Sequence, residues 1–271
     1  MLLAIDIGNT NIVLGLLDGD RLDQQWRLAT HHHYTSDECA ATLRSLFDLA
    51  GVDRAQVSHA IISCVVPPLL PIFERTCLKS FDLTPLVVGP GMRTGMPIAV
   101  DNPPEVGADR IVNAVAAYER LGAPVIAIDF GTAITFDCVS AAGEFVGGLI
   151  LPGLLVSLDA LIDRASKLAS VELVKPPAVI GKNTTHMLQS GMIYGYAGLV
   201  DMTVERIREE LGREARVIAT GGLAHLIAAE TKSIERVDPF LTLDGLRILF
   251  DRNHGQVSRS AGGVDAPGGI D

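Results

Sequence analysis

The sequence predicts an α/β protein in which one domain occurs twice, with the two copies facing each other across a cleft. Apolar stretches typical of buried strands alternate along the chain with segments whose apolar residues recur at helical spacing. In addition, a motif of the form A-I-D-x-G, followed by small or polar residues and lying between two apolar runs, occurs at residues 4–8 and again at 127–131. Such a repeated motif indicates a duplicated structural unit.

The first copy is predicted to form a strand, a tight turn and a second strand that ends near Asp18. Gly8 permits backbone dihedral angles that are closed to other residues, and the amides and hydroxyl groups of Asn9 and Thr10 can point into the turn. Such a turn suits phosphate, and the carboxylate of Asp6 suits a magnesium ion bound to that phosphate. The alternative is an ordinary hairpin in which Asp6 and Asn9 only satisfy backbone groups of the turn.

The second copy repeats this arrangement with Asp129, Gly131 and Thr132, and it places Asp137 where the first copy has Asp18. Because each copy offers one acid and one hydroxyl group, the two turns together predict a site that holds a single polyphosphate between them. The chain has no G-x-x-x-x-G-K-[ST] phosphate loop, so the two turns are the candidate phosphate-binding elements.

Charge and cysteine content narrow the class of protein. The 271-residue chain has a formal net charge of −10, which argues against nucleic acid or an anionic membrane as a partner. No apolar run is long enough to cross a membrane, and the first strand follows Met1 too closely to leave room for a signal peptide. The four cysteines lack C-x-x-C and zinc-binding spacing, so we expect reduced thiols and a cytoplasmic location.

The remaining elements follow in order along the chain. Before the second hairpin, the pattern predicts helix 37–50, strand 60–66, helix 67–79, strand 86–88, a turn-rich loop and helix 104–121. After it, the pattern predicts strand 147–151, a helix to residue 169, an irregular segment 174–180, a long helix capped near Asn183, strand 217–220 and a last helix from residue 239. We expect domains at 1–115 and 116–253 and a disordered tail at 254–271.

Helix 104–121 is the candidate to carry a catalytic carboxylate. Beside its apolar face, Glu105, Asp109 and Asn113 recur every fourth residue. Two carboxylates one turn apart are tolerated on a wet surface, so a solvated stripe is one interpretation. If the stripe lines the cleft instead, burial and repulsion raise the pKa of Asp109 and make it a general base, and the adjacent Arg110 can hold an anionic substrate.

Four segments in this order make the sequence resemble the type III pantothenate kinase family, a branch of the actin, sugar-kinase and heat-shock-ATPase superfamily. They are 6–11 (D-I-G-N-T-N), 101–110 (D-N-P-P-E-V-G-A-D-R), 129–133 (D-F-G-T-A), and 181–184 (G-K-N-T) with 189–191 (Q-S-G). The resemblance implies two ribonuclease-H-like domains of the actin-like ATPase type and a homodimer. It also implies transfer of the γ-phosphate of ATP to the hydroxyl of pantothenate, giving 4'-phosphopantothenate in the first step of coenzyme A biosynthesis.

The resemblance further implies roles for individual residues. Asp109 is expected to be the base, Thr132 to bind ATP, and Asp129 to ligate a monovalent cation, potassium or ammonium. ATP is expected to bring Mg²⁺ or another divalent cation. The first phosphate loop is expected to comprise Asp6, Ile7, Gly8, Asn9, Thr10, Asn11, Ile12 and Val13. Pantothenate is expected to contact Gly107, Ala108, Asp109, Arg110 and Thr184, the last of these across the dimer interface.

Two other interpretations stay open. A non-catalytic relative that keeps the fold as an accessory binding protein predicts a decayed active site, whereas Asp6, Asp109 and Asp129 are all present. A phosphotransferase for a different small alcohol would keep the same phosphate turns. The sequence departs from the family at Val100, where many members carry tyrosine, and this departure bears on a substrate-side aromatic contact.

Overall fold

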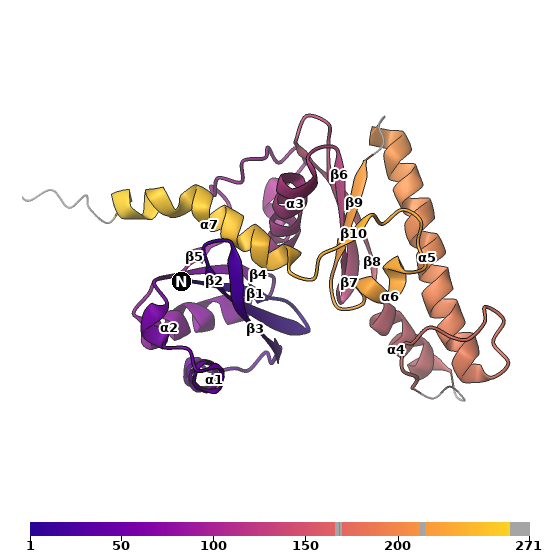
Figure 1. Ribbon diagram of the computed structural model, residues 1–271, viewed down its shortest axis with the longest axis horizontal. Coiled ribbons are helices and arrows are strands. Elements are labelled where there is room, and N and C mark those ends of the chain that lie inside the picture. Colours follow the sequence, from indigo (N-terminus) through magenta and orange to yellow (C-terminus); the bar gives the residue numbers. More distant parts are fainter. Residues whose placement is uncertain (166–167, 169, 212–214, 261–271) are drawn as a thin grey trace, which may run out of the picture.

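The two predicted copies form two five-stranded sheets. The computed structural model describes residues 1–165, 168, 170–211 and 215–260, with residues 255–260 described by their backbone alone. The strand order is β3-β2-β1-β4-β5 in the first sheet and β10-β9-β6-β7-β8 in the second. Figure 1 shows the two sheets as neighbouring units, with helices between them and on their outer sides.

The first half contains the first sheet and the two helices α1 and α2. Helix α1 begins where Thr35 and Glu38 form a capping box, and it ends at Gly51, whose φ of 66° is left-handed. The elements of this half are β1 (Leu2–Ile7), β2 (Asn11–Asp18), β3 (Arg21–Ala29), α1 (Ser36–Ala50), β4 (His59–Cys64), α2 (Leu70–Phe81), β5 (Leu86–Val87) and the short 3₁₀ helices η1 (Arg54–Gln56), η2 (Pro67–Leu69) and η3 (Pro103–Glu105).

The second half begins with α3, which leads into the second hairpin. Its longest helix, α5, has 28 residues and begins after Asn183, whose side chain accepts a hydrogen bond from the N–H of His186 at 2.9 Å. The elements are α3 (Ala108–Leu121), β6 (Val125–Phe130), β7 (Ala133–Val139), β8 (Phe145–Pro152), α4 (Leu154–Arg164), α5 (Thr184–Leu211), β9 (Arg216–Thr220), α6 (Ala224–Ala228), β10 (Arg236–Val237) and α7 (Leu241–Ser260).

The topology of the first sheet is repeated in the second. Strand β1 is antiparallel to β2 and parallel to β4, just as β6 is antiparallel to β7 and parallel to β9. Burial repeats as well, because β1 and β6 each bury every residue except the aspartate one position before the end, Asp6 or Asp129. The predicted duplicated α/β architecture is therefore confirmed.

The pairing register corrects one correspondence between the two copies. Asp137 pairs with Ala127 in the second hairpin, as Gly15 pairs with Ala4 in the first. The equivalent of Asp137 is therefore Gly15, and the expected match with Asp18 is wrong. The second turn is one residue shorter and shifts its return strand by a single position, whereas Asp18 lies three positions beyond Gly15, so the spacing in the two strands does not match.

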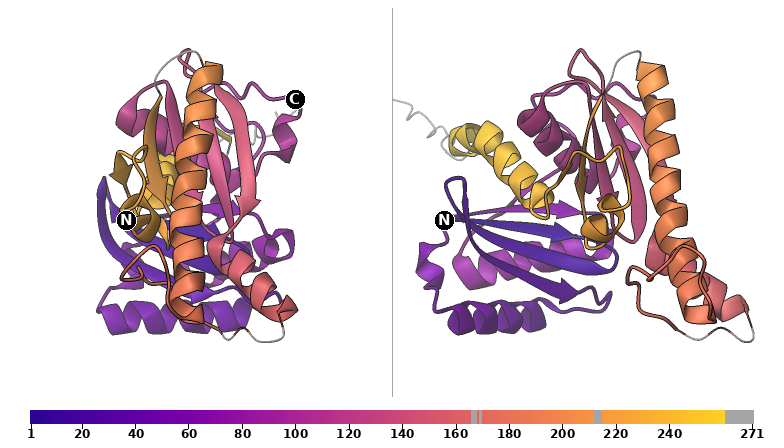
Figure 2. Two further views of the ribbon diagram at one scale, coloured as in Figure 1. Left: turned by 90° about the vertical axis from the view of Figure 1, so that its right-hand side faces the viewer. Right: turned by 45° about the vertical axis from the view of Figure 1, so that its right-hand side comes forward.

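Three hydrophobic cores lie between the layers of the molecule. One core joins the outer face of the first sheet to α1 and α2, and another joins the outer face of the second sheet to α4, α5 and α6. The third lies between the sheets and contains the apolar faces of α3 and α7. The two views of Figure 2 show α5 along the outer side of the second sheet, away from the first. Helices α3 and α7 thus lie between the two sheets.

Helices α3 and α7 approach each other closely. A β-carbon on Gly245 of α7 would lie 2.3 Å from the carbonyl oxygen of Val112 in α3, so only glycine fits at this crossing. Helix α3 itself begins at Ala108, later than the predicted residue 104, because the Pro103–Glu105 segment forms a separate 3₁₀ turn. Glu105 therefore does not lie on the same helix as Asp109.

Three further points concern the ends and edges of the fold. Strand β3 was not predicted from the sequence, because most of its residues are polar or partly exposed. Helix α7 continues through Ser260, into the segment expected to be a disordered tail, and residues 261–271 lie outside the described part of the chain. The boundary at residues 115 and 116 falls within α3 and stays a prediction. Among the described residues, no helix combines the length and the apolar character that crossing a membrane requires.

Candidate active site

The tips of the two hairpins touch. The hydroxyl groups of Thr10 and Thr132 lie 2.6 Å apart and share a hydrogen bond, although the residues are 122 positions apart in sequence. In the described part of the chain, the backbone N–H groups of Asn9, Thr10 and Thr132 donate to no protein acceptor, and all three residues are exposed. Free amides at a tight turn are the donors that bind phosphate oxygens.

Asp6 and Asp129 occupy equivalent positions near the ends of β1 and β6. Successive side chains of a strand point to opposite faces, so each aspartate shares its face with the alanine two residues earlier, Ala4 or Ala127. Both alanines belong to the central core between the sheets, so both carboxylates point toward the layer that contains α3. Gly221 provides the space beside Asp129, because a β-carbon there would lie 2.6 Å from a carboxylate oxygen of Asp129.

Asp109 lies in the first turn of α3, which brings it into the same layer. The preceding N-cap residue is Gly107, where a β-carbon would lie 2.6 Å from the Oδ1 atom of Asp109. The backbone N–H of Arg110 donates to the same oxygen at 2.8 Å. Burial raises the pKa of Asp109, whereas the N–H group and the positive charge of Arg110 lower it. A carboxylate with a raised pKa is a stronger proton acceptor than an exposed aspartate.

We call Asp6, Asp109 and Asp129 the acidic junction, because their charges act on one another. Burial raises the pKa of Asp6 to about 7, and the negative charge of Asp109 raises it as well. Burial likewise raises the pKa of Asp129 to about 6, again with a contribution from Asp109. Three carboxylates that repel one another in a partly buried place are stabilised by cations or by proton uptake.

Asn113 connects the acidic junction to α7. Its Nδ2 donates to Asp129 at 3.1 Å, and its Oδ1 accepts from the hydroxyl of Thr242 at 2.8 Å. Asn113 is only 1% exposed and Asp109 is partly buried, so the interpretation as a solvated stripe is wrong for these two residues. It holds for Glu105, which is exposed and accepts a hydrogen bond from Asn102. The position of Asn113 therefore fixes the carboxylate of Asp129.

Arg110 forms an ion pair within the second half. Its Nε donates to Asp137 at 2.6 Å, and the hydroxyl of Thr135 donates to the other carboxylate oxygen at 3.1 Å. Burial raises the pKa of Asp137 to about 7, while the charge of Arg110 lowers it. The guanidinium group also lies 6.0 Å from the ring centre of Phe145. These contacts hold Arg110 in place beside Asp109. Sequence reasoning missed Asp137, because nothing in its local pattern marks it as a partner of Arg110.

The other predicted site residues are placed as follows. Ile7 and Ile12 are completely buried core residues, so they can offer a ligand only their backbone groups. The N–H of Gly8 donates to the carbonyl oxygen of Asn11 at 3.0 Å, which closes the first turn. Val13, on the strand after this turn, is partly buried. Ala108, the first residue of α3, packs against the central core.

Thr184 and Val100 lie outside the acidic junction. Thr184 is the exposed first residue of α5, and no hydrogen bond joins it to the acidic junction among the described residues. Val100 packs against the central core, with a methyl group 3.7 Å from the position that a β-carbon of Gly147 would take. The structure thus brings the predicted carboxylates and the two turns together, but it does not bring Thr184 of the same chain to them.

The carboxylates suit a cation that is held mainly by other ligands. Within the described residues, no group of three or more His, Cys, Asp or Glu side chains could hold a metal ion by itself. Mg²⁺ bound to nucleotide phosphates keeps several water molecules and needs only one or two protein carboxylates. Asp6 and Asp129, each beside a turn with free amides, fit that requirement.

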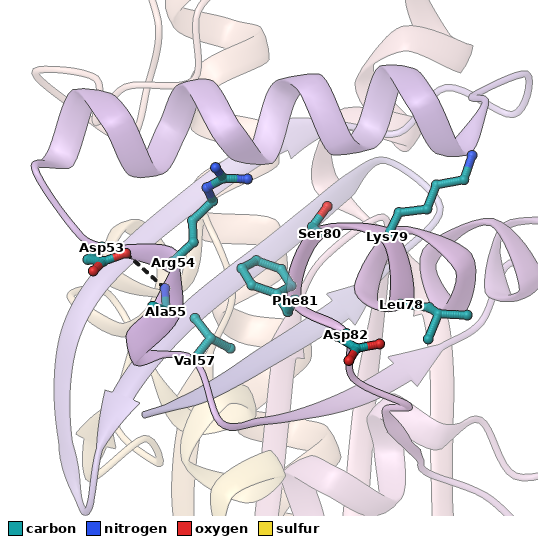
Figure 3. Close-up of a pocket in the computed structure, with 9 residues that line it drawn as sticks. All are labelled: Asp53, Arg54, Ala55, Val57, Leu78, Lys79, Ser80, Phe81 and Asp82. Carbon is teal, nitrogen blue, oxygen red and sulfur yellow. Dashed lines mark hydrogen bonds between the residues drawn. The ribbon is translucent and has the colours of Figure 1, made fainter.

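A separate pocket lies in the first half, between the 3₁₀ helix η1 and the end of α2. Figure 3 shows its lining residues, which include Arg54, Val57, Lys79 and Phe81. Lys79 pairs with Asp37 at 2.8 Å and is not free to bind a ligand. The pocket contains none of the residues predicted to act in catalysis, so we assign the chemistry to the acidic junction.

Comparison with known proteins places the chain in a family. A family model described as "Type III pantothenate kinase" matches residues 2–206. A type III pantothenate kinase of Geobacter sulfurreducens is 56% identical over 253 residues, covering 93% of this chain and 99% of that protein. A type III pantothenate kinase of Myxococcus xanthus is 54% identical over 254 residues, covering 94% of this chain and 99% of that protein.

Solved structures support the fold. A Campylobacter jejuni protein described as a Baf family transcriptional activator has a TM-score of 0.59 at 19% identity, covering 93% of this chain and 99% of that chain. Component A of the (R)-2-hydroxyglutaryl-CoA dehydratase of Acidaminococcus fermentans has a TM-score of 0.53 at 13% identity, covering 91% and 94%. At these identities the likeness concerns the fold alone. The family model and the high identity over nearly the whole chain establish that this chain belongs to the type III pantothenate kinase family.

Proposed function

We propose that this protein transfers the γ-phosphate of ATP to the hydroxyl of pantothenate at the acidic junction. The observation that carries the proposal is the position of Asp109, whose charge acts on both Asp6 and Asp129 at the ends of the two hairpins. The ATP phosphates lie between the two turns and accept hydrogen bonds from the free amides there. Family membership provides the substrate, and the geometry supports the assignment of roles.

In the proposed reaction, Asp109 takes the proton of the pantothenate hydroxyl. The hydroxyl oxygen then forms a bond to the γ-phosphorus while the bond from that phosphorus to the bridging oxygen of ADP breaks. The products are 4'-phosphopantothenate and ADP, and the proton leaves from Asp109 to solvent. Phosphoryl transfer requires mainly positioning and charge neutralisation from a protein, so two turns, cations and one base are sufficient.

Arg110 is the proposed binding group for the carboxylate of pantothenate. A guanidinium group matches a carboxylate in shape and charge, and Arg110 neighbours Asp109 on the same helix turn. Its ion pair with Asp137 uses Nε, which restricts where the rest of the group can point. We assign Gly107 and Ala108 to the same substrate wall, because Gly107 leaves the space in which the Asp109 carboxylate lies.

Cations are assigned to the two hairpin aspartates. Asp6 would hold the divalent ion that accompanies ATP, and Asp129 would hold the monovalent cation, potassium or ammonium. These ions would neutralise the negative charge of the phosphates, which the three nearby carboxylates would otherwise repel. Asn113 supports the second assignment, because its hydrogen bond keeps one oxygen of Asp129 oriented.

The protein is proposed to act as a homodimer in the cytoplasm. The four cysteines are free thiols, as expected in a reducing compartment. A surface formed by β8, α4, the 174–180 segment and the start of α5 exposes large apolar side chains, among them Ile150 at 64%, Ile180 at 82% and Met187 at 57%. A second copy of this chain covering that surface would bring Thr184, which lies within it, toward the partner's substrate.

This dimer proposal has a direct test. Ile150→Asp and Ile180→Asp should give monomers in analytical ultracentrifugation. If Thr184 acts across the interface, mixing inactive Thr184→Arg and Asp109→Asn proteins under subunit exchange should restore activity, because each mixed dimer contains one intact site. Wild-type activity in a strictly monomeric variant would contradict the shared site.

The catalytic assignment is tested with Asp109→Asn. This variant should lose about 10²- to 10⁴-fold in kcat for pantothenate phosphorylation, because proton transfer by a positioned base contributes that much. Its affinity for ATP should stay within a few-fold of wild type by calorimetry. Glu105→Gln, an exposed carboxylate on the preceding turn, is the matched control and should behave as wild type. Wild-type turnover in Asp109→Asn would refute the assignment. If the protein were a non-catalytic accessory protein, wild type and Asp109→Asn would both bind ATP and neither would phosphorylate pantothenate.

A further inference from the structure

Arg27 is a charged residue that has no assigned role in the proposed reaction. It lies on β3, where it pairs with Val13 of β2, the last residue of the first phosphate loop. Two hydrogen bonds from Thr30, three residues further along, connect the chain to that loop. Its N–H donates to the carbonyl oxygen of Thr10 at 2.9 Å, and its hydroxyl donates to the carbonyl oxygen of Gly8 at 2.7 Å. The position of Arg27 is therefore fixed relative to the first turn.

The side chain of Arg27 points toward the second half. The preceding residue, Trp26, stacks on Phe47 of α1 with ring centres 5.1 Å apart, which places Trp26 on the outer face of the sheet. Strand alternation then puts Arg27 on the inner face, the face that carries Asp6. Its Nη1 lies 3.6 Å from the position that a β-carbon of Gly222 would take, in the turn that follows β9.

This contact brings a positive charge from the first half beside the acidic junction. The turn containing Gly222 follows Thr220, which pairs with Asp129 in the second sheet. The charge of Arg27 lowers the pKa of Asp129, as expected for a cation nearby. Arg27 is exposed, and its side chain forms no hydrogen bond or ion pair with the described residues, unlike that of Arg110, which is paired with Asp137. Its guanidinium donors thus remain available to a ligand.

We propose that the guanidinium group of Arg27 binds the phosphate chain of ATP from the side of β3, bridging the two halves over the nucleotide. The proposal rests on the proposed function, which puts the ATP phosphates between the two turns. An exposed arginine with free donors, fixed beside a phosphate-binding turn and facing an acidic cluster, is suited to bind an anion that the acids alone would repel. Arg27 is in this account a phosphate-binding residue and takes no part in proton transfer.

The test compares ATP with adenosine on Arg27→Met. Isothermal titration calorimetry with Mg²⁺ should show about 10- to 100-fold weaker ATP binding, the factor expected from losing a hydrogen bond to a charged group. Adenosine, which has no phosphate, should bind as it does to wild type. Arg27→Lys should restore part of the loss. Arg21→Met is the matched control, because Arg21 is an exposed arginine on the same strand, about 20 Å from Arg27 at the rise of a β-strand.

The outcomes separate this proposal from the proposed function. If Arg27→Met binds ATP within about twofold of wild type, or loses ATP and adenosine affinity equally, the role of Arg27 is refuted. If its melting temperature falls in parallel with its ATP affinity, Arg27 is structural and the proposal is also refuted. If wild-type protein binds ATP but does not phosphorylate pantothenate, the proposed function fails, while the ratio of ATP to adenosine affinity still decides the role of Arg27.

Discussion

The hydroxyl groups of Thr10 and Thr132 lie 2.6 Å apart, so the two hairpin turns are joined by one side-chain hydrogen bond. Each threonine lies beside free backbone amides and directly before the second strand of its hairpin, β2 or β7. A polyphosphate between the turns would replace this hydrogen bond with bonds from both hydroxyl groups to its oxygens. The contact therefore marks the place at which the two halves meet around a ligand.

Removing either hydroxyl should weaken nucleotide binding. Thr10→Val and Thr132→Val each preserve side-chain shape, and each should lower ATP affinity by about 2- to 10-fold, the equivalent of one hydrogen bond. Their stability should stay near wild type, because both residues are exposed. Thr231→Val, in which a threonine bonded to Ala228 is changed, is the control. Unchanged ATP affinity in both variants would show that the two hydroxyl groups do not bind phosphate.

The ionised carboxylate of Asp6 should destabilise the ligand-free protein at alkaline pH. Its pKa in the folded protein is about 7, raised from the ordinary value of 3.8, so ionisation destabilises the fold above pH 7 and this cost disappears as the pH falls toward 3.8. Asp6→Asn should therefore raise the free energy of unfolding by about 1–3 kcal/mol at pH 8 and by less at pH 5.

Urea unfolding at the two pH values measures this effect. The exposed Asp18, at the end of β2, offers a control in Asp18→Asn, which should show no pH-dependent gain. Asp6→Asn should at the same time lose activity, because the proposed metal ligand is gone. A loss of stability in Asp6→Asn at pH 8 would contradict the burial of an ionised carboxylate at this position.

The activity should depend on the protonation of Asp109. Burial raises the pKa of this carboxyl group, and only its ionised form accepts a proton. The value of kcat/KM for pantothenate should therefore rise with pH and level off above the raised pKa. In Asp109→Asn the residual activity should lose this ascending limb. A wild-type profile whose ascending limb lies at or below the ordinary aspartate pKa of 3.8 would exclude a base with a raised pKa.

The ion pair of Arg110 and Asp137 should serve mainly to orient Arg110 toward pantothenate, and the pair as a whole should add little to the stability of the fold. Asp137→Leu leaves Arg110 without its charge partner and should destabilise the fold by about 3–5 kcal/mol. Changing both residues, in Arg110→Met with Asp137→Leu, should recover much of that loss, because no unpaired charge remains. The KM for pantothenate should rise in both. Equal stability of the single and double variants in urea unfolding would contradict the prediction that the unpaired charge of Arg110 causes the loss.

The sequence was informative wherever a local pattern determined the structure. The motif around Asp6 and Asp129 predicted both hairpins and the duplication, because strands and turns with glycine have short-range signals. The apolar spacing before Tyr118 predicted α3, although its start was set by Gly107 rather than by proline. By contrast, β3 is an edge strand of mixed polarity and carries no such signal.

The parts that could not be predicted depend on contacts between distant residues. The ion pair of Arg110 with Asp137 and the bridge from Asp129 through Asn113 to Thr242 need the fold before they exist. The place of Arg27 is likewise set by the approach of two sheets, not by its neighbours in sequence. Residues whose partners lie far away in the sequence were therefore the ones that sequence reasoning overlooked.

Two similar turns are proposed to hold one triphosphate while Asp109 faces its terminal phosphate. A crystal structure with Mg²⁺ and a non-hydrolysable ATP analogue tests this most directly. We expect the β- and γ-phosphates to lie within hydrogen-bond distance of the amides of Asn9, Thr10 and Thr132, with the Asp109 carboxylate facing the γ-phosphorus. A triphosphate bound elsewhere, for example in the pocket beside Phe81, or an Asp109 carboxylate turned away from the phosphate, would contradict it.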